Sequence, residues 1–452
     1  MSRKYLALAV VLVLLGLPVG TSAQKKPLSL EEAVATGVAA SPALHASLMR
    51  VESSAAKSRE STAERLPSFK LGGGYLRLSE IPPFAVNLPI FPNPIIVSQN
   101  YFNSFSLRLG VQQPLFTGFR LQAGEESARM LEQSAGQDLE KDRSEFVFGV
   151  KSAYWELARG RELEKVIREN IRQIGEHLKD VRAFHDQGMA TKNDILQIEL
   201  ELSKAELLRI EARNAAEIAQ AALNNLIGWP LNTEIELTTS ADSIVAGYGP
   251  GQGSGPGQVQ AGDRPQVEEA LARRPDLKSA EFRVKASESG VKAARAGYYP
   301  QVFLAGNYYY LRPNPRILPA QDTFRGTWDV GVAVSFDIWN WGQTKYQAEQ
   351  ARAQLDQARD ARKLLEDQAI LEITQSRLNL DHAGEKIQVA VLAVSQAEEN
   401  LRVTRERFRQ GIALNTDVLD ADVAHFRARV SRTQSAIELA LAQAALEKAM
   451  GY

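Results

Sequence analysis

The segment Arg407-Phe408-Arg409-Gln410-Gly411-Ile412-Ala413-Leu414-Asn415-Thr416-Asp417-Val418-Leu419-Asp420 predicts one helix ending, a tight turn and a second helix beginning. Gly411 suits the position after a helix, where the backbone turns left-handed at little cost for glycine. Asn415 or Thr416 is expected to cap the next helix, and Asp417 places a carboxylate near its positive end. Long amphipathic sequence on both sides makes this segment the tip of a helical hairpin.

The same pattern occurs earlier, in the segment His185-Asp186-Gln187-Gly188-Met189-Ala190-Thr191-Lys192-Asn193-Asp194-Ile195-Leu196. The offset in numbering that carries Gly188 onto Gly411 also carries Ala219–Leu223 onto the identical run Ala442–Leu446 without a gap. A match of this length indicates an internal duplication. We therefore divide the chain into a first repeat (24–230), a Gly/Pro-rich linker (231–265) and a second repeat (266–452). Within the linker, residues 240–265 are expected to be flexible.

Composition excludes several classes of site. The formal net charge of −1 gives no reason to expect a nucleic-acid partner. The absence of cysteine excludes disulfides, thiolate metal sites and a lipid-modified cysteine. The five histidines show no metal-ligand spacing, so we expect neither a metal nor another cofactor.

Residues 1–23 are predicted to be a signal peptide. Arg3 and Lys4 supply the charged region, Leu6–Leu17 the apolar region, and Thr21-Ser22-Ala23 the cleavage site. The apolar run is short for a membrane anchor, which is the alternative. The mature chain is therefore expected to be exported. If it lies in a membrane, it must span as a closed barrel.

Each repeat is expected to contain a helix, two strands and a long helical hairpin. The first helix, 29–64, begins with a capping-box pair, Ser29 and Glu32, and Pro42 kinks or divides it. Strands are predicted at 69–78, at 105–111 (closed by Pro114), at 302–311 and at 328–337. The hairpins occupy 121–227 and 343–450.

The strands alternate between apolar and polar or small residues, as in barrels that face lipid outside and water inside. Aromatic residues gather near the strand ends. A periplasmic coiled-coil protein with two small sheets is the alternative. Four strands cannot close a membrane barrel, so two copies (eight strands) or three (twelve) are needed, and periodicity alone does not choose. The polar face predicts barrel-lumen residues: Ser104, Ser106, Arg108, Asp329, Ser335 and Asp337.

The duplicated order of elements and the Gly411-to-Asp420 tip resemble the TolC-like outer membrane efflux proteins. The Ser41-Pro42-x-Leu44, Arg274-Pro275-x-Leu277 and Trp339–Gly342 segments add to the resemblance. It implies a mainly α fold with a membrane β-barrel. A homotrimer would form one twelve-stranded barrel, embedded in outer membrane lipid and continuous with a periplasmic helical barrel. It also implies a periplasmic adaptor and an inner-membrane pump as partners. Unlike many relatives, this chain lacks a lipid-modified cysteine and carries Ala413 where some have a gate arginine.

The resemblance implies an outer-membrane exit duct for small toxic molecules such as drugs, or for polypeptides secreted by an ATP-driven exporter. No nucleophile elbow, phosphate loop or zinc-binding His-Glu-x-x-His motif supports an enzyme. The two tips are expected to contact the adaptor, through Gly188, Met189 and Ala190 and through Gly411, Ile412 and Ala413. Asp417 and Asp420 are expected to form acidic rings at a periplasmic gate. For Asp417, stabilisation of the helix N-terminus is an equally weighted alternative.

Overall fold

The computed structural model describes residues 26–82, 84–86, 89–90, 92, 95–98, 100–247 and 264–452. The predicted signal peptide lies outside the described residues, and so does most of the glycine-rich part of the predicted linker. The chain forms two compact units. The helical unit comprises the described residues of Met1–Ala46, Glu140–Arg274 and Asp367–Tyr452; the sheet unit comprises those of Ser47–Leu139 and Pro275–Glu366. Each unit therefore takes sequence from both repeats.

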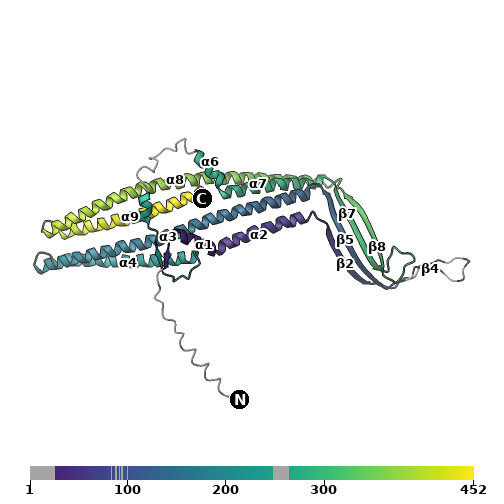
Figure 1. The fold of residues 1–452 in the computed structure, drawn as a ribbon, viewed down its shortest axis with the longest axis horizontal. Helices are drawn as coiled ribbons and strands as arrows, with labels where there is room; N and C mark the ends of the chain where they lie inside the picture. The colour runs from purple at the N-terminus through teal and green to yellow at the C-terminus, as the bar shows by residue number, and fades with distance from the viewer. Residues whose placement is uncertain are drawn as a thin grey trace, which may run out of the picture. The chain divides into compact units, whose positions relative to one another are not determined.

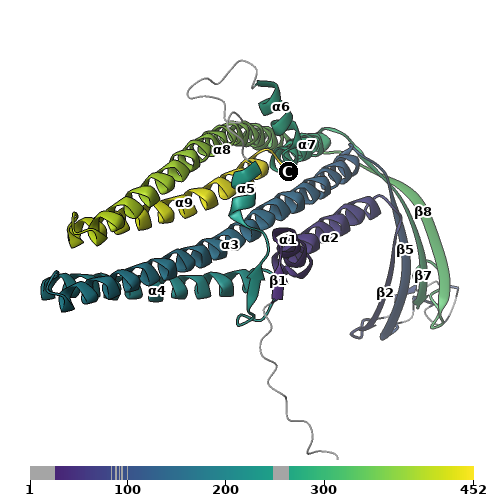
Figure 2. The same ribbon diagram turned by 60° about the vertical axis from the view of Figure 1, so that its left-hand side comes forward.

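Two long hairpins follow the duplication residue by residue. The first consists of α3 (Arg120–Asp186) and α4 (Lys192–Leu226), and the second of α8 (Gln343–Arg409) and α9 (Asn415–Ala449). The long arms have 67 residues each and the short arms 35. Within the helical unit the two hairpins lie side by side (Figures 1 and 2).

Each long helix is preceded by two consecutive residues with left-handed backbone. Gly118 and Phe119 have φ of 62° and 69°, and Trp341 and Gly342 have φ of 55° and 80°. The two pairs occupy matching places in the repeats, but glycine and the aromatic residue exchange positions. An added side chain at Gly118 would come 2.5 Å from the carbonyl oxygen of Ala296, so only glycine fits there. The turn geometry is therefore the same in both repeats although its residues differ.

One antiparallel sheet joins the two repeats in the sheet unit (Figure 2). Its strand order is β2 (Ser68–Arg77), β5 (Asn103–Thr117), β7 (Gln301–Arg312) and β8 (Arg325–Ser335). The prediction that Pro114 closes the second strand was wrong. β5 continues past Pro114 because the register shifts between Pro114 and Phe116, so a residue without an N–H is accommodated at a bulge.

The pairing register gives this sheet two different faces. One face, which we call the apolar face, is formed by Phe69, Leu71, Tyr75, Phe105, Leu107, Leu109, Val302, Leu304, Tyr308, Tyr310, Trp328, Val330, Val332 and Val334. The other, the polar face, carries Ser104, Ser106, Arg108, Asn307, Asp329 and Ser335. β3 (Phe84–Val86) and β4 (Ile95–Ser98) form a separate two-stranded sheet between β2 and β5 in the chain.

The predicted first helix is divided at Pro42 into α1 (Leu30–Ala40) and α2 (Pro42–Ala63). Ser29 and Glu32 form the expected capping box. Ser41 is extended, and its hydroxyl accepts a hydrogen bond from the Leu44 N–H, so the break provides its own cap. The second repeat has the corresponding helices α6 (Arg264–Arg273) and α7 (Pro275–Ala294), followed by a short 3₁₀ helix, Arg295–Tyr298.

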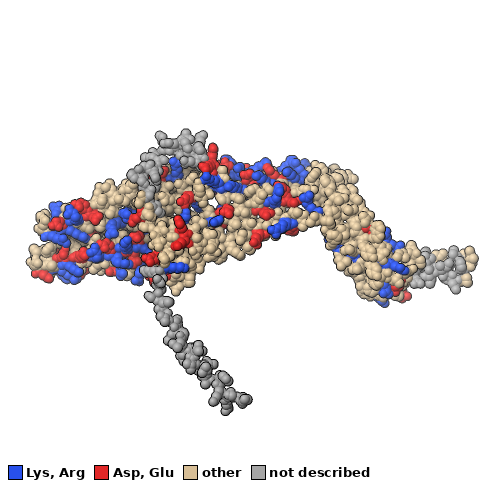
Figure 3. Space-filling model, in the orientation of Figure 1, with Lys and Arg blue, Asp and Glu red and all other residues tan. Residues whose placement is uncertain are grey.

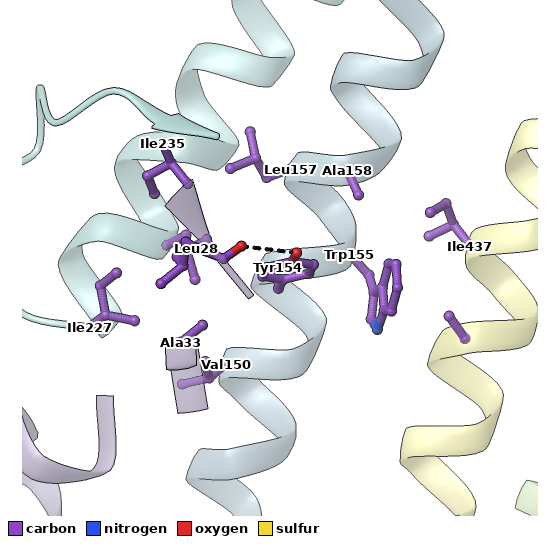
Figure 4. Close-up of a cluster of buried hydrophobic side chains, with 12 residues drawn as sticks. Leu28, Ala33, Val150, Tyr154, Trp155, Leu157, Ala158, Ile227, Ile235 and Ile437 are labelled. Atoms are coloured by element: carbon purple, nitrogen blue, oxygen red, sulfur yellow. Dashed lines mark hydrogen bonds between the residues drawn. The ribbon is translucent and has the colours of Figure 1, made fainter. Parts of the chain in front are cut away.

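The main core of the helical unit lies where a small parallel sheet meets α3. β1 (Lys26–Leu28) pairs with β6 (Ile235–Leu237), which places Leu28 and Ile235 against Tyr154 and Leu157 of α3 (Figure 4). The Tyr154 hydroxyl donates to the Leu28 carbonyl, at 3.2 Å, and accepts from the Thr239 N–H, at 3.0 Å. One buried hydroxyl thus ties both strand segments to the helix.

Part of the predicted linker forms secondary structure. Residues 235–237 form β6, and α5 (Ala241–Gly247) is a short helix. Ala241 and Val245 pack against a buried cluster on α8 and α9, and Asp242 pairs with Arg432 at 2.7 Å. Two apolar side chains with the right spacing to share one helical face explain why this segment folds.

On the face shown in Figure 3, Lys, Arg, Asp and Glu side chains are spread over the helices, whereas the surface over the strands is largely uncharged next to the helices and carries charges toward its loop end. In the part of the chain that the structure describes, no helix is both long enough and apolar enough to cross a membrane.

We predict that Tyr154→Phe lowers the free energy of unfolding by about 1–3 kcal/mol, because the Thr239 N–H and the Leu28 carbonyl lose a buried partner. The measurement is thermal or denaturant unfolding of the detergent-solubilised protein, followed by circular dichroism. Tyr346→Phe is the control, because that tyrosine is 62% exposed. Equal stability of the two variants would contradict the tethering role of Tyr154.

Candidate functional site

Both hairpin tips use the same helix-ending geometry. Gly188 and Gly411 have φ of 77° and 75°, and each lies two residues after the last residue of its long helix. The next residue's N–H reaches back to a carbonyl in the last turn: Met189 to Phe184 at 2.8 Å, and Ile412 to Arg407 at 2.9 Å. No atom lies within 4 Å of an added Cβ at either glycine, so backbone conformation and not space requires glycine.

The starts of α4 and α9 differ although the tips match. Thr191 caps α4 in a full capping box, with the Asp194 carboxylate accepting from the Thr191 N–H at 2.8 Å. The Thr191 hydroxyl, followed by this N–H, holds the pKa of Asp194 below its usual range. Leu414 occupies the matching position in α9 and supplies no side-chain cap. Asp417 alone accepts from the Leu414 N–H, at 2.9 Å.

The prediction that Asn415 or Thr416 caps α9 was therefore wrong. Asn415 is the first residue of the helix and is buried at 6% exposure. Its side chain is used in a contact with the other hairpin, described below. Asp417 has the helix-capping role that the sequence analysis weighed as its alternative function.

The tips present apolar side chains to solvent. Met189 and Ile412 are 65% and 63% exposed, and Leu414 is 69% exposed. Gly188 and Gly411 are exposed, whereas Ala190 and Ala413 are half-buried. Leu414 was not among the predicted contact residues, although it is at least as exposed as Met189 and Ile412. The alignment of the two repeats already showed that Leu414 stands where the first repeat has the capping Thr191.

The two predicted gate carboxylates, Asp417 and Asp420, both lie near the start of α9, and both are exposed. Their side chains lie on neighbouring positions of that surface, as residues three apart do. A single chain places them together but does not form a ring, so their role at a constriction remains a prediction.

Five buried or half-buried residues connect the two hairpins behind the tips; we call them the inter-hairpin network. The His177 Nε2–H of α3 donates to Asn415 Oδ1 of α9 at 2.8 Å. Asn170 of α3 donates to the Asp422 carboxylate at 2.9 Å, and Arg405 of α8 donates to its other oxygen at 3.0 Å.

Asp422 is the central charge of the inter-hairpin network, with a side chain only 7% exposed. Burial raises the pKa of the Asp422 carboxyl, whereas the Arg405 guanidinium and the Asn170 amide act in the opposite direction. Burial also lowers the pKa of His177, which favours the neutral ring that donates to Asn415. The network therefore combines a buried carboxyl, paired with Arg405, and a histidine whose pKa is lowered by burial.

The duplication provides a second copy of this ion pair in a different environment. Arg182 and Glu199, which align with Arg405 and Asp422 in the repeat, also pair, at 2.7 Å. Their side chains are 55% and 37% exposed, compared with 29% and 7% for the second-repeat pair. The sequence analysis missed the network. The sequence feature that could have revealed it is the helical spacing of two polar residues, Asp422 and His425, with the apolar Val418 and Ala421. All four lie on one buried side of the helix.

The polar face of the sheet carries most of the predicted lumen residues. Ser104, Ser106, Arg108, Asp329 and Ser335 share that face through the register. Asn307 links the two charges, because its oxygen accepts from Arg108 at 2.8 Å and its amide donates to Asp329 at 2.8 Å. Asp337 departs from the prediction, because β8 ends at Ser335 and Asp337 is not part of the sheet. Whether this face lines a lumen remains a prediction.

The described residues contain no group of three or more His, Cys, Asp or Glu side chains placed to hold a metal ion. The candidate functional features are the tips and the inter-hairpin network in the helical unit, and the polar face in the sheet unit.

We predict that Asp422→Ala lowers the free energy of unfolding by about 3 kcal/mol, because it leaves the largely buried Arg405 and Asn170 without their acceptor. The matched control is Glu199→Ala, which removes the exposed copy of the same pair and should cost less than about 1 kcal/mol. Denaturant unfolding of the detergent-solubilised protein at neutral pH measures both. Similar losses in the two variants would show that burial of the second pair has no special importance.

Residues 38–229 and 266–452 match the family described as "Outer membrane efflux protein". The chain is 23% identical over 359 residues to the outer membrane efflux protein BepC of Brucella suis, covering 78% of this chain and 73% of BepC. It is 24% identical to the alkaline protease secretion protein AprF of Pseudomonas aeruginosa, covering 72% of this chain and 62% of AprF.

The fold is similar to that of the outer membrane protein VceC from Vibrio cholerae, with a TM-score of 0.75 and 19% identity, covering 93% of this chain and 96% of VceC. These comparisons confirm the resemblance and the outer-membrane location inferred from the sequence. The family and the fold are those of channel proteins. Because the matched residues include both tips, both long hairpins and all four strands of the central sheet, this chain belongs to the outer membrane efflux protein family.

Proposed function

We propose that this protein is the outer-membrane exit duct of a tripartite export system and acts without catalysis. The observation that carries the proposal is the sheet of β2, β5, β7 and β8. Its apolar face suits lipid and its polar face suits a water-filled interior. Its two outer strands, β2 and β8, each have one side without a strand partner among the described residues.

Unpaired strand edges in a membrane require closure, because backbone groups there find no water. A homotrimer closes the sheet with twelve strands if β8 of each copy pairs with β2 of the next. The first and second repeats then alternate around one barrel, lined by the polar face.

The hairpin tips are proposed to dock on a periplasmic adaptor that connects the duct to an inner-membrane pump. Exposed Met189, Ile412 and Leu414 give the tips an apolar contact surface. Gly188 and Gly411 fix the turns that present it.

The proposed cargo is small toxic molecules such as drugs. The secretion of polypeptides by an ATP-driven exporter is the second candidate, favoured by the similarity to AprF, whose name describes protease secretion. Arg108, Asn307 and Asp329 are linked by hydrogen bonds and give the polar face both positive and negative charge. This mixed charge does not favour a strictly cationic or a strictly anionic cargo.

Acidic rings at the periplasmic end are proposed to form the gate. In a trimer, Asp417 and Asp420 of each copy would repeat around the axis as two rings of three carboxylates. Such rings favour cations and can bind them. Like charges at this spacing repel, so packing elsewhere, including the inter-hairpin network, must hold the closed state.

We predict that Gly188→Val or Gly411→Val abolishes export while the trimer and its sheet persist, because a β-branched residue is strained at positive φ and the turn must move. Export is measured as restored resistance to a toxic dye in cells lacking the native chain, and assembly by native mass spectrometry. Gly175→Val is the control, since that glycine is helical and has equally open surroundings. Intact export in the tip variants would refute the contact role.

We predict that Asp417→Asn combined with Asp420→Asn weakens block by polyvalent cations and reduces cation preference in single-channel recordings. Asparagine keeps an oxygen that can accept from the Leu414 N–H, so the charge is removed and the helix cap is retained. Asp194→Asn, in the first tip, is the control. Unchanged block and selectivity in the double variant would show that Asp417 and Asp420 are solvated helix-surface charges and do not line the constriction.

A further inference from the structure

Charged side chains on the strands of the sheet follow a simple rule. The four strands carry Lys70, Arg77, Arg108, Arg312, Arg325 and Asp329. By register, Arg77 and Arg312 are the two on the apolar face. Each is also the last residue of its strand, β2 and β7, at the end of the sheet opposite the strand starts that follow α2 and the 3₁₀ helix. The apolar face is thus free of strand charges until its loop end, where both charges are guanidinium groups.

A cluster of aromatic rings lies directly beside these two arginines. The Phe105 ring is 5.0 Å from the Tyr75 ring and 5.9 Å from the Phe324 ring, and Phe324 stacks on Tyr310 at 5.1 Å. Tyr75, Phe324 and Tyr310 are all exposed, by 57%, 41% and 40%. Aromatic rings of this kind gather where a membrane's hydrocarbon meets its headgroups. The cluster therefore marks the height at which headgroups begin.

Both guanidinium groups are held by neighbours that leave them accessible. Arg77 donates to Asn103 Oδ1 at 2.8 Å and lies 5.3 Å from the Phe102 ring centre. Arg312 lies 5.8 Å from the ring centres of both Phe105 and Phe324, and Asp322 holds it through two hydrogen bonds. Both arginines flank the same part of β5, because Arg77 pairs with Asn103 and Arg312 with Phe105.

We propose that Arg77 and Arg312, with the ring cluster beneath them, form a binding site for the phosphorylated headgroup of an outer-leaflet lipid. Guanidinium groups bind phosphate oxygens through paired N–H donors. The rings and the apolar face below them contact the acyl chains. A lipid with two phosphates offers one phosphate to each of the two arginines, which lie on strands on either side of β5.

The site rests on the proposed function, because that function sets the apolar face against lipid and the loop end outside the cell. Charge complementarity selects this occupant. Asn103 and Asp322 satisfy only some of the five N–H donors of each of Arg77 and Arg312, so an apolar protein partner would cover the remaining donors without supplying acceptors. A second copy of the chain is a poorer match, since Arg77 and Arg312 would then face each other's positive charge across the contact.

The test measures lipid bound to the detergent-solubilised, assembled protein by native mass spectrometry. The probe is bisphosphorylated lipid A, compared with the same lipid after removal of both phosphates. The parent protein should bind the bisphosphorylated form at least about tenfold more strongly. Arg77→Gln combined with Arg312→Gln should remove that preference, because each basic residue near an anionic headgroup contributes measurably to its binding.

Arg108→Gln is a closely matched control on the opposite face of the same sheet. Arg108 also bonds to an asparagine oxygen, at 2.8 Å, and lies 5.5 Å from a ring centre, that of Tyr309. This variant should keep the full preference for phosphorylated lipid. Circular dichroism and native mass establish that each variant is folded and assembled before lipid is added.

Each remaining outcome overturns the inference in a distinguishable way. Equal binding of the two lipids by the parent would show that phosphate is not recognised. Competition by millimolar inorganic phosphate without any requirement for acyl chains would make the ligand a free anion. Loss of assembly in the Arg77/Arg312 variant would assign the surface to contact between copies. Failure of the parent to appear in outer-membrane fractions would instead overturn the proposed function.

Discussion

The arrangement of both hairpins depends on backbone that turns left-handed at fixed places. One such turn precedes each long helix and another follows it, at Gly118–Phe119 and Gly188 in the first repeat and at Trp341–Gly342 and Gly411 in the second. Because the turns recur at matching places in the two repeats, the arms between them have equal lengths. Equal lengths bring the two tips to corresponding positions, so that buried side chains of α3 can contact those of α9. A side chain that forbade positive φ at one tip would displace every contact beyond it.

Duplication also left the two repeats free to diverge where their surroundings differ. Thr191 in the first repeat corresponds to Leu414 in the second, so that one tip keeps a full cap while the other exposes an apolar side chain. The pair Arg182–Glu199 is exposed, whereas Arg405–Asp422 is covered and gains a third partner, Asn170. A buried ion pair is weak evidence for added stability, but it penalises any packing that leaves one partner unpaired. The second repeat thus carries the contacts that depend on the relative position of the hairpins.

Much of the fold follows from local sequence, and the exceptions arise from contacts distant in the chain. Gly188 and Gly411 predicted the tips because left-handed backbone has few alternatives to glycine. Strand alternation predicted which side chains share a face. Asn415 was wrongly predicted as the cap because asparagine is a good capping residue. In the structure it is the first residue of the helix, and its side chain accepts a hydrogen bond from His177, 238 positions earlier. Pro114 misled because a bulge is a property of two strands together. Asp422 was missed because acidic residues on long helices are usually solvated, and only its place between Val418 and His425 indicated burial.

The inter-hairpin network and the proposed gate occupy different sides of α9, and helix geometry shows why both can operate. At about 100° per residue, the buried positions Val418, Ala421, Asp422 and His425 centre on one side of the helix. Asp420 points roughly 150° away from that side, and Asp417 about 90° away. The side that faces α3 is therefore fixed by hydrogen bonds and apolar packing within one chain, while Asp420 on the far side and Asp417 at the flank remain exposed. Rotation of α9 that moved Asp420 would have to break the bonds from Asn170 and His177. Because Asn170, His177 and Asp422 are buried, breaking their hydrogen bonds would leave polar groups without partners away from solvent. The buried contacts of α9 therefore oppose a rotation that would move the exposed Asp420.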